Sequence, residues 1–551
     1  MADERIQYNE EMVGAGHPAK ADTLNRLALA AHNTDGTHKS WVDVKEYGAA
    51  GDGATDDTAV IQTAIDTGKP VYIPFTAAHY RITGEVIVST EGQTIFGDGN
   101  LSLIKQYTNN MNLFRVTADR VKITGLALEG TSTGTESNLP ASYGAGVVLY
   151  DVEGCEVTGN YFKNCSAPTQ AAGAAVWLTG ARNCGVFDNF IDDSYIGINS
   201  DGWITDSISY RNQIRGNIVF NVKHGYYGDF QGAQQANHIG DIVESNVFYS
   251  FTSSAITVDR ATRFSVNGNH ITGVKGDANY DAQGIAVIKG SKYGTINANI
   301  IGNCGDNGIV LNDVDGSTVR YISVTGNTIN NCDQDGIQLY TCAQISIVGN
   351  TITNNGRHGI RSVSASYPRA IAISGNTIYK NSQHGILLYD PQSFTLSGNI
   401  ISRNGQAVSN TYDGVYAGAV NLVMHGVMIN GNIFHDANTD GAETQRYAVN
   451  VSGAYTGFSF THNVTSGQVS GALNDSSGGV FKIGNTDDVS ARILKISGKY
   501  HHGSTTAPDS GTWAAGDIVY NIAPSAGGFL GWVCTAAGTP GTWKTFGAIS
   551  A

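Results

Sequence analysis

Three short stretches of this 551-residue sequence carry an aspartate at the same place after a small residue. They read GINSD, GYYGD and AITVDR, and the fifth residue of each is Asp201, Asp229 or Asp259. Subtracting these positions gives intervals of 28 and 30 residues, a repeat length typical of stacked solenoids. The spacing predicts a column of carboxylates on one outer face, where like charges raise one another's pKa. We predict that this column is the active site.

Paired carboxylates at this spacing have the chemistry of glycoside hydrolysis. Neighbouring turns of a solenoid lie about 4.8 Å apart, so adjacent aspartates are expected about 5 Å apart and the outer two about 10 Å apart. A glycosidase needs two carboxyl groups about 5 Å apart for retention, or roughly 6.5–9.5 Å apart for inversion. Mutual repulsion is expected to keep one carboxyl protonated while another stays ionised. Aspartates at strand ends also cap turns, which is the alternative interpretation of the column.

Polar and aromatic residues surround the predicted column. The aromatic members offer flat faces for sugar rings, and the two cations are expected to neutralise carboxylates or to hold an acidic sugar. The histidine is a candidate for assisting proton transfer, although a role at a turn or core edge is the alternative for it. The predicted substrate-binding residues are Trp177, Asn199, Trp203, His224, Tyr227, Arg260 and Lys289.

These residues are positioned by a repeat that runs from about residue 95 to 475. Alternating apolar strands end in an asparagine turn, and successive asparagines lie 23 to 33 residues apart by subtraction. Asparagine tolerates the left-handed backbone of such turns, and its stacked amides can hydrogen-bond along the axis. The asparagines concerned are Asn160, Asn189, Asn217, Asn246, Asn269, Asn299, Asn327, Asn350, Asn376, Asn399 and Asn432.

A second repeated unit, Gly-apolar-x-apolar, completes each turn. It recurs at positions 146, 284, 308, 336 and 385. Side chains alternate along a strand, so the second and fourth residues are expected in the core and the third and fifth outside. Three short parallel strands per turn predict an all-β fold, a right-handed single-stranded parallel β-helix. Its outward residues are most polar and aromatic between 177 and 260, and blander in the coils that follow.

The start of the repeat has its own signature at Trp41–Val88. The pattern predicts strands at 42–44, 71–73 and 80–82 and a helix from about 57 to 66, capped by Thr55-Asp-Asp. A helix beside the first turn seals a solenoid against strand addition. The sequence VKEYGAAGDGATDDTAVIQTAI within this stretch resembles the opening of the pectate lyase superfamily, VKDFGAxGDGxxDDTxAIQxAI. That resemblance implies a right-handed parallel β-helix rather than one particular reaction.

The two ends of the chain differ from the repeat. Residues 9–39, with a short helix expected at 23–32, resemble the N-terminal stretch of some bacteriophage tail spikes and fibres. The sequence GWVCTAAGTPGTWKTFG at 531–547 resembles terminal modules of tail spikes. We therefore divide the chain into a virion-attachment or oligomerisation segment (1–39), an N-terminal cap (40–94), a catalytic β-helix (95–478) and a small C-terminal β domain for trimerisation or glycan binding (479–551).

Composition excludes several other classes of protein. A net charge of −14 argues against nucleic acid, which requires clustered Lys and Arg. Seven cysteines without a CxxC pair indicate neither a disulfide framework nor a zinc site, and Cys165, Cys304 and Cys332 are expected to be small buried fillers. No signal peptide or membrane span is evident. The acidic residues Asp313, Asp315, Asp333 and Asp335 are expected to be solvated, with a calcium site as the alternative.

These observations favour a phage tail-spike depolymerase, an endo-glycosidase that needs no cofactor and hydrolyses a bacterial capsular or exopolysaccharide. Resemblance to tail spikes implies a homotrimer, attachment of the N-terminus to another tail or baseplate protein, and a place in the virion tail after synthesis in the host cytoplasm. Polygalacturonases are similar in carrying aspartates on this sheet. Their adjacent Asp-Asp pair, Gly-His-Gly and Arg-Ile-Lys are missing here, so their residue roles are not transferred.

Two other functions stay open at this stage. A lyase acting by β-elimination on a uronic-acid polymer would use a base near the sugar C5 and a cation on its carboxylate. Arg260, Lys289, Tyr227 and His224 could form that set, with Ca²⁺ as a possible cofactor of such a lyase. The other alternative is a receptor-binding spike that holds glycan in the same groove without cutting it.

Overall fold

The computed structural model describes residues 40–131, 144–165, 173–201, 209–229, 239–274, 282–312, 316–363, 368–436, 443–476, 478–485, 494–496 and 499–551. The predicted N-terminal helix and Trp203 lie outside these residues. The chain divides into two compact units, Met1–Asp306 and Asn307–Ala551, which we describe separately.

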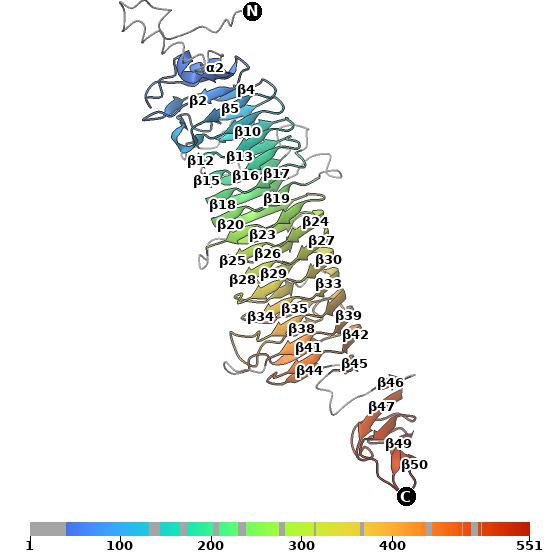
Figure 1. Ribbon diagram of the computed structural model, residues 1–551. Coiled ribbons are helices and arrows are strands. Elements are labelled where there is room, and N and C mark those ends of the chain that lie inside the picture. Colours follow the sequence, from blue (N-terminus) through green and yellow to red (C-terminus); the bar gives the residue numbers. More distant parts are fainter. Residues whose placement is uncertain are drawn as a thin grey trace, which may run out of the picture. The chain divides into compact units, whose positions relative to one another are not determined.

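The first unit begins with the predicted cap, in which a 3₁₀ helix η1 (Val44–Tyr47) and an α-helix α2 (Thr58–Ile65) accompany the first strands (Figure 1). Ile61 and Ile65 of α2 are buried against the strand stack. The capping prediction was wrong for the Asp57 side chain, which makes no hydrogen bond to the helix start, whereas the Asp56 carboxylate accepts the Thr58 backbone N–H at 3.1 Å. The Asp57 carboxylate instead accepts the backbone N–H groups of Ala50 and Gly51 at 2.6 and 2.9 Å, because the Gly/Asp loop folds back over it.

Three columns of parallel strands make up the rest of the first unit, as predicted for a right-handed β-helix. A second 3₁₀ helix, η2, spans Gly99–Leu101. Column A contains β1 (Val42–Asp43), β2 (Val71–Ile73), β5 (Thr94–Gly97), β8 (Lys122–Thr124), β11 (Glu156–Thr158), β14 (Gly185–Phe187), β17 (Gln213–Arg215), β19 (Ile242–Glu244), β21 (Ser265–Asn267) and β24 (Lys292–Asn297).

Columns B and C lie on either side of a bend, and two long strands run through both. Column B contains β3 (Tyr80–Ile82), β6 (Leu103–Gln106), β9 (Ala127–Glu129), β12 (Tyr161–Lys163), β15 (Phe190–Asp192), β22 (His270–Thr272) and β25 (Ile300–Gly302). Column C contains β4 (Val86–Val88), β7 (Phe114–Val116), β10 (Val147–Tyr150), β13 (Ala174–Thr179), β16 (Ile196–Asp201) and β23 (Gln283–Ile288). The long strands are β18 (Ile218–Asp229) and β20 (Val247–Asp259).

The second unit repeats the three columns. Column A contains β27 (Val319–Thr325), β30 (Cys342–Val348), β33 (Arg369–Ser374), β36 (Gln392–Ser397), β39 (Met424–Asn430), β42 (Tyr455–Thr461) and β45 (Phe481–Ile483). Column B contains β28 (Thr328–Asn330), β31 (Thr351–Thr353), β34 (Thr377–Tyr379), β37 (Ile400–Ser402), β40 (Ile433–His435) and β43 (Val464–Ser466). Column C contains β26 (Ile309–Asn312), β29 (Ile337–Leu339), β32 (Ile360–Ser362), β35 (Ile386–Tyr389), β38 (Val415–Gly418), β41 (Tyr447–Ser452) and β44 (Gly471–Asp475).

A five-stranded sheet follows in the last part of the chain, and unlike the columns it is mainly antiparallel. Its strands are β46 (Leu494–Ile496), β47 (Lys499–Ser504), β48 (Ile518–Asn521), β49 (Phe529–Ala536) and β50 (Thr542–Ala548).

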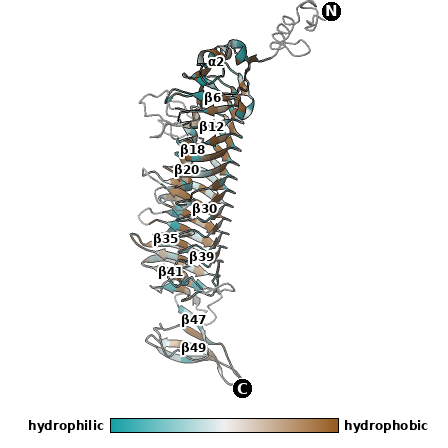
Figure 2. Cartoon of the chain, turned by 90° about the vertical axis from the view of Figure 1, so that its left-hand side faces the viewer, coloured by the Kyte–Doolittle hydropathy of each residue, from teal (hydrophilic) through white to brown (hydrophobic). Residues whose placement is uncertain are grey.

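The core of each unit follows the predicted alternation. In β26 and β29, Ile309, Leu311, Ile337 and Leu339 are fully buried, and hydrophobic residues recur along the strand stack of each unit in Figure 2. All seven cysteines are free and buried, which confirms the prediction of small core fillers. No helix among the described residues is long and apolar enough to cross a membrane.

A ladder of buried asparagines fixes the register between turns. In the first unit each ladder amide accepts both the backbone and the side-chain N–H of the preceding asparagine, as between Asn189 and Asn217 at 3.0 Å for both bonds. The second unit has the same pattern, and it extends beyond the predicted asparagines to Asn463 and Asn485. These bonds satisfy polar groups that have no access to water, so each turn is held against a shift along the next.

We predict that Asn376→Ala destabilises the protein by about 1–3 kcal/mol, because it leaves the buried N–H of Asn350 and carbonyl of Ile347 without partners. Urea unfolding followed by circular dichroism measures the change. The matched control is Asn330→Ala. Asn330 is exposed on the outer side of its strand, next to the buried Ile329, so this substitution is expected to change stability by less than about 0.5 kcal/mol. Equal effects of the two substitutions would contradict a structural role for the ladder.

Candidate active site

The three aspartates lie side by side in column C of the first unit. Asp201 of β16 pairs in register with Asp229 of β18, which pairs in register with Asp259 of β20. Thr179 precedes this column of aspartates and Ile288 follows it at the same strand position. The predicted placement of the three carboxylates is therefore correct, and we call Asp201, Asp229 and Asp259 the aspartate column.

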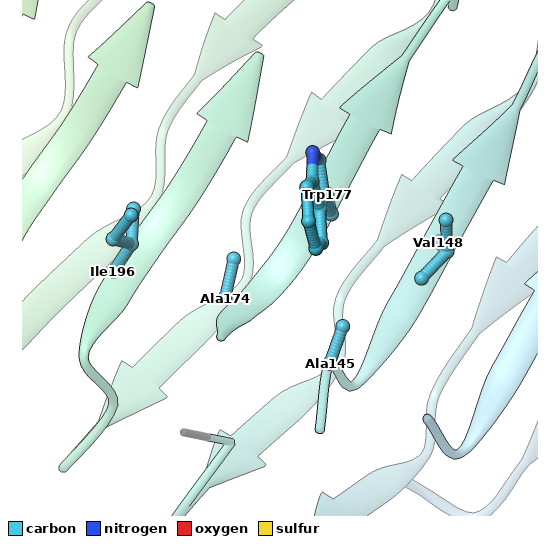
Figure 3. Close-up of a cluster of buried hydrophobic side chains, with 5 residues drawn as sticks. All are labelled: Ala145, Val148, Ala174, Trp177 and Ile196. Atoms are coloured by element: carbon cyan, nitrogen blue, oxygen red, sulfur yellow. The ribbon is translucent and has the colours of Figure 1, made fainter. Parts of the chain in front are cut away.

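Asp201 is held by two of the residues predicted to bind substrate. Its carboxylate accepts the Trp177 indole N–H at 2.9 Å and the Asn199 amide N–H at 2.8 Å. Trp177 is only 3% exposed, and it lies in an outer apolar cluster with Val148 and Ile196, shown in Figure 3. The expectation that Trp177 offers an open face to sugar was wrong, because its indole is packed in this cluster and aimed at Asp201.

Asp259 is fully buried and lies against both predicted cations. Its two oxygens contact Lys289 Nζ at 2.5 Å and Arg260 Nη1 at 3.1 Å. Burial and the neighbouring Asp229 carboxylate raise the pKa of Asp259 to about 6, against the opposing effect of Lys289 and Arg260. Asp259 therefore changes its protonation state close to neutral pH, as a general acid must.

Asp229 is the most exposed carboxylate of the column, with 13% of its side chain accessible. The Arg260 guanidinium lies 3.3 Å from it and so bridges Asp229 and Asp259. Tyr227 lies half-buried on the same strand, and burial and the Asp229 carboxylate raise the pKa of its phenol. The arrangement places one partly accessible carboxylate beside a buried one, with Arg260 in contact with both.

His224 lies beside the column and is not positioned as a free acid or base. Its Nδ1 lies 3.0 Å from the Ser254 hydroxyl, which contacts the Thr257 hydroxyl at 2.5 Å. Burial and the charge of Lys223 lower the pKa of His224 to about 3, so the imidazole is neutral at physiological pH. Its ring packs edge-on against Tyr227, with centroids 5.0 Å apart, which orients that phenol.

The structure also contains buried acids that sequence reasoning did not place in the site. Asp241 is buried inside the coil, where its carboxylate accepts the Tyr226 hydroxyl at 3.0 Å and both the backbone and the side-chain N–H of Asn212. Burial raises its pKa to about 6. Asp241 lies outside the asparagine ladder, at a position that Cys184 and Asn212 occupy on the two preceding turns.

The second acidic group in the sequence differs from its prediction. Asp313 and Asp315 lie outside the described residues, whereas Asp335 is fully buried rather than solvated and contacts Arg361 at 3.4 Å. Within the described part of the chain, no group of three or more His, Cys, Asp or Glu side chains is placed to hold a metal ion.

Comparison with known proteins agrees with the fold described above. Residues 41–273 match the family described as "Rhamnogalacturonase A/epimerase, pectate lyase-like", and residues 230–371 match "Right handed beta helix region". Over these residues the chain is similar to pectate-lyase-like proteins, and its fold is a right-handed β-helix.

Individual relatives include enzymes and phage proteins. A mannuronan C5-epimerase of Azotobacter vinelandii is 26% identical over 251 residues, which is 40% of this chain and 12% of that protein. The pre-neck appendage protein of Bacillus phage phi29 is 30% identical over 134 residues, which is 21% of this chain and 16% of that protein. The chain thus spans only 12% and 16% of the lengths of these two relatives. Tailspike protein 3 of bacteriophage CBA120 matches over 92% of this chain and 68% of its own, with 13% identity and a TM-score of 0.42.

We predict that Asp259 makes the protein less stable as pH rises from about 4 to about 7. Its folded pKa of about 6 exceeds the ordinary value of 3.8, so the folded state holds the proton more tightly than the unfolded chain. Ionisation therefore costs stability between these two values, by up to about 3 kcal/mol. Urea unfolding of the wild type and of Asp259→Asn across this pH range measures the effect. The wild type should lose stability relative to the variant, and a constant difference would show that Asp259 does not titrate there.

Proposed function

We propose that the protein is a phage tail-spike depolymerase that hydrolyses a bacterial surface polysaccharide at the aspartate column. The observation that carries the proposal is the in-register stacking of Asp201, Asp229 and Asp259 on β16, β18 and β20. Such a column brings like charges together at strand spacing, which is electrostatically unfavourable. We take this cost as an indication that the carboxylates have a function. Phage and polysaccharide-modifying relatives support the same class of function.

Each carboxylate has a proposed role that follows from its surroundings. Asp229 is accessible and acts as nucleophile or base, whereas Asp259, with its raised pKa, is the proton donor. Adjacent turns lie about 4.8 Å apart, which corresponds to the carboxyl separation of about 5 Å in retaining glycosidases. Asp201, fixed by Trp177 and Asn199, completes the negative surface that stabilises positive charge on the sugar in the transition state.

The cations limit how much charge the site accumulates. Arg260 bridges two aspartates and Lys289 contacts one, so two positive groups offset part of the charge of three carboxylates. Tyr227, half-buried beside Asp229, is the described aromatic side chain best placed to meet a sugar. The phage relative, an appendage protein, further supports a place in a virion. We also propose a homotrimer whose N-terminal segment attaches to another tail protein, which rests on the resemblance of residues 9–39 to tail spikes.

A lyase or epimerase is the second candidate, and the positions of Arg260, Lys289 and Tyr227 favour it. The two cations would neutralise a uronate carboxylate, and the tyrosine beside them would act as the base that removes the proton at C5. One relative is a mannuronan C5-epimerase, a class of enzyme that acts on such a polymer. Both cations already contact Asp259 or Asp229, which leaves them less available to an acidic sugar, so we favour hydrolysis.

We predict that Asp229→Asn and Asp259→Asn lower polysaccharide cleavage at least roughly 100-fold while polymer binding persists, because the catalytic pair loses an acid or a nucleophile. The assay follows reducing ends and the ultraviolet absorbance of unsaturated sugars together, on a panel of bacterial capsular polysaccharides and alginate. Asp201→Asn should have a smaller effect. Asp192→Asn, at an outward position of β15 away from the column, is the matched control.

The outcomes separate the candidates. Reducing ends without absorbance support hydrolysis, and both signals together indicate a lyase. Altered uronate composition without either signal indicates an epimerase. Binding without any chemical change, unaffected by the substitutions, indicates a receptor-binding spike and contradicts the proposal.

We predict that the cleavage rate falls as pH rises through about 6, because Asp259 must be protonated to donate its proton. Lys289 favours the ionised form, so Lys289→Met should raise the pKa of Asp259 and move this fall to higher pH. Lys292→Met, on β24 beyond the column, serves as the control. An unchanged pH profile in Lys289→Met would exclude Asp259 as the acid.

A further inference from the structure

The second unit has a cluster of aromatic side chains on the outer face of its column C. We call Tyr389, Tyr412, Tyr416, His384 and Arg446 the His384 cluster. The His384 ring packs against Tyr412 and Tyr416 with centroids 5.2 and 5.3 Å apart, and Tyr389 lies 6.3 Å from Tyr416. All five side chains are partly exposed. The expectation that the outward residues of these coils are blander was therefore wrong. Tyr416 and Tyr389 lie at third and fifth strand positions, and the other members of the cluster come from outside those positions.

Arg446 is held in a fixed orientation beside these rings. Its Nε and Nη2 donate to the two oxygens of the fully buried Asp413 at 2.9 and 2.8 Å. Asn450 donates to the same carboxylate at 2.9 Å. The Arg446 side chain is 32% exposed, and its Nη1 makes no hydrogen bond within the part of the chain that the structure describes. That N–H group is thus aligned in advance for a ligand oxygen.

The histidines of this face are fixed in one tautomer. His384 Nδ1 accepts the Asp413 backbone N–H at 2.9 Å, and His358 Nδ1 accepts the His384 backbone N–H at 3.2 Å. Each neutral ring therefore carries its proton on Nε2. Burial lowers the pKa of His384 to about 4 and that of His358 to about 2, so both are neutral at physiological pH. With Asp413 paired to Arg446, the cluster carries no net charge.

We propose that the His384 cluster is a second, non-catalytic site that binds a neutral sugar ring. Partly exposed tyrosine rings match the apolar face of a pyranose, as aromatic groups do in many ligand sites. The Arg446 Nη1 and His384 Nε2 N–H groups donate to its hydroxyl or ring oxygens. The cluster binds without cleaving, because glycoside hydrolysis needs a pair of carboxyl groups and the carboxylate that contacts the cluster is that of Asp413 alone.

This site is independent of the aspartate column and shares with the proposed function only the chemical class of the ligand. By holding a sugar unit of the polysaccharide, the His384 cluster would retain the polymer on the protein between cleavage events without altering the chemical step.

Affinity electrophoresis of the full-length protein tests the proposal, in gels cast with dextran or hydroxyethyl cellulose as neutral probes and with alginate or polygalacturonate as acidic ones. The wild type should be retarded by a neutral polymer, and Tyr416→Ala or Tyr412→Ala should weaken the apparent dissociation constant roughly tenfold or more. Tyr379→Ala, at a half-buried outward position of β34, is the matched control. Urea midpoints establish that each variant is folded.

Each outcome decides the question. Equal retardation of the wild type and the Tyr416 and Tyr412 variants would place binding elsewhere, and retardation by acidic polymers alone, or by none, would overturn a neutral-sugar site. Asp229→Asn is run in the same gels and should be retarded like the wild type. If no polymer is ever cleaved, the proposed function fails while the retardation of the Tyr416 variant still tests this site.

Discussion

The buried asparagine ladder is the interaction on which the rest of the structure depends. A parallel β-helix has no local hydrogen bonds to fix its register, because each strand pairs only with residues one whole turn away. The amides supply that register by joining successive turns, as from Asn217 to Asn246 in the first unit and from Asn376 to Asn399 in the second. A shift of one residue would exchange core and outer side chains, so the ladder also determines which residues face outward.

The aspartate column follows from this register and carries an electrostatic cost. Three carboxylates on successive turns would repel strongly without Arg260, in the coil of Asp259, and Lys289, in the coil that follows, which contact Asp229 and Asp259. The pairing is incomplete, and burial leaves Asp259 with a pKa of about 6. In such a site the folded protein keeps a buried carboxyl whose ionisation is unfavourable, and a pKa shifted in this way suits acid–base chemistry near neutral pH.

On the outer face of the second unit, in contrast, charged groups are neutralised by pairing. Two buried carboxylates of this unit, Asp335 and Asp413, are each paired with an arginine, Arg361 or Arg446. Its histidines accept backbone N–H groups and stay neutral. Tyr389 occupies the strand position that holds aspartate in the first unit, and it lies beside Tyr416 and the neutral His384. One backbone repeat thus supports two chemically different surfaces.

The sequence by itself determined the β-helix, the asparagine ladder and the alignment of Asp201, Asp229 and Asp259. Each of these depends on periodicity, because a regular turn length and the alternation of side chains place equivalent residues above one another. It did not determine that Trp177 turns its indole onto Asp201 or that tyrosines pack around His384, and it left open whether Lys289 neutralises a carboxylate or holds an acidic sugar. Those contacts join side chains a whole turn apart, and their geometry depends on how neighbouring side chains pack. Only the tertiary structure decides burial, and burial sets which acid holds its proton and which aromatic ring remains open to a ligand.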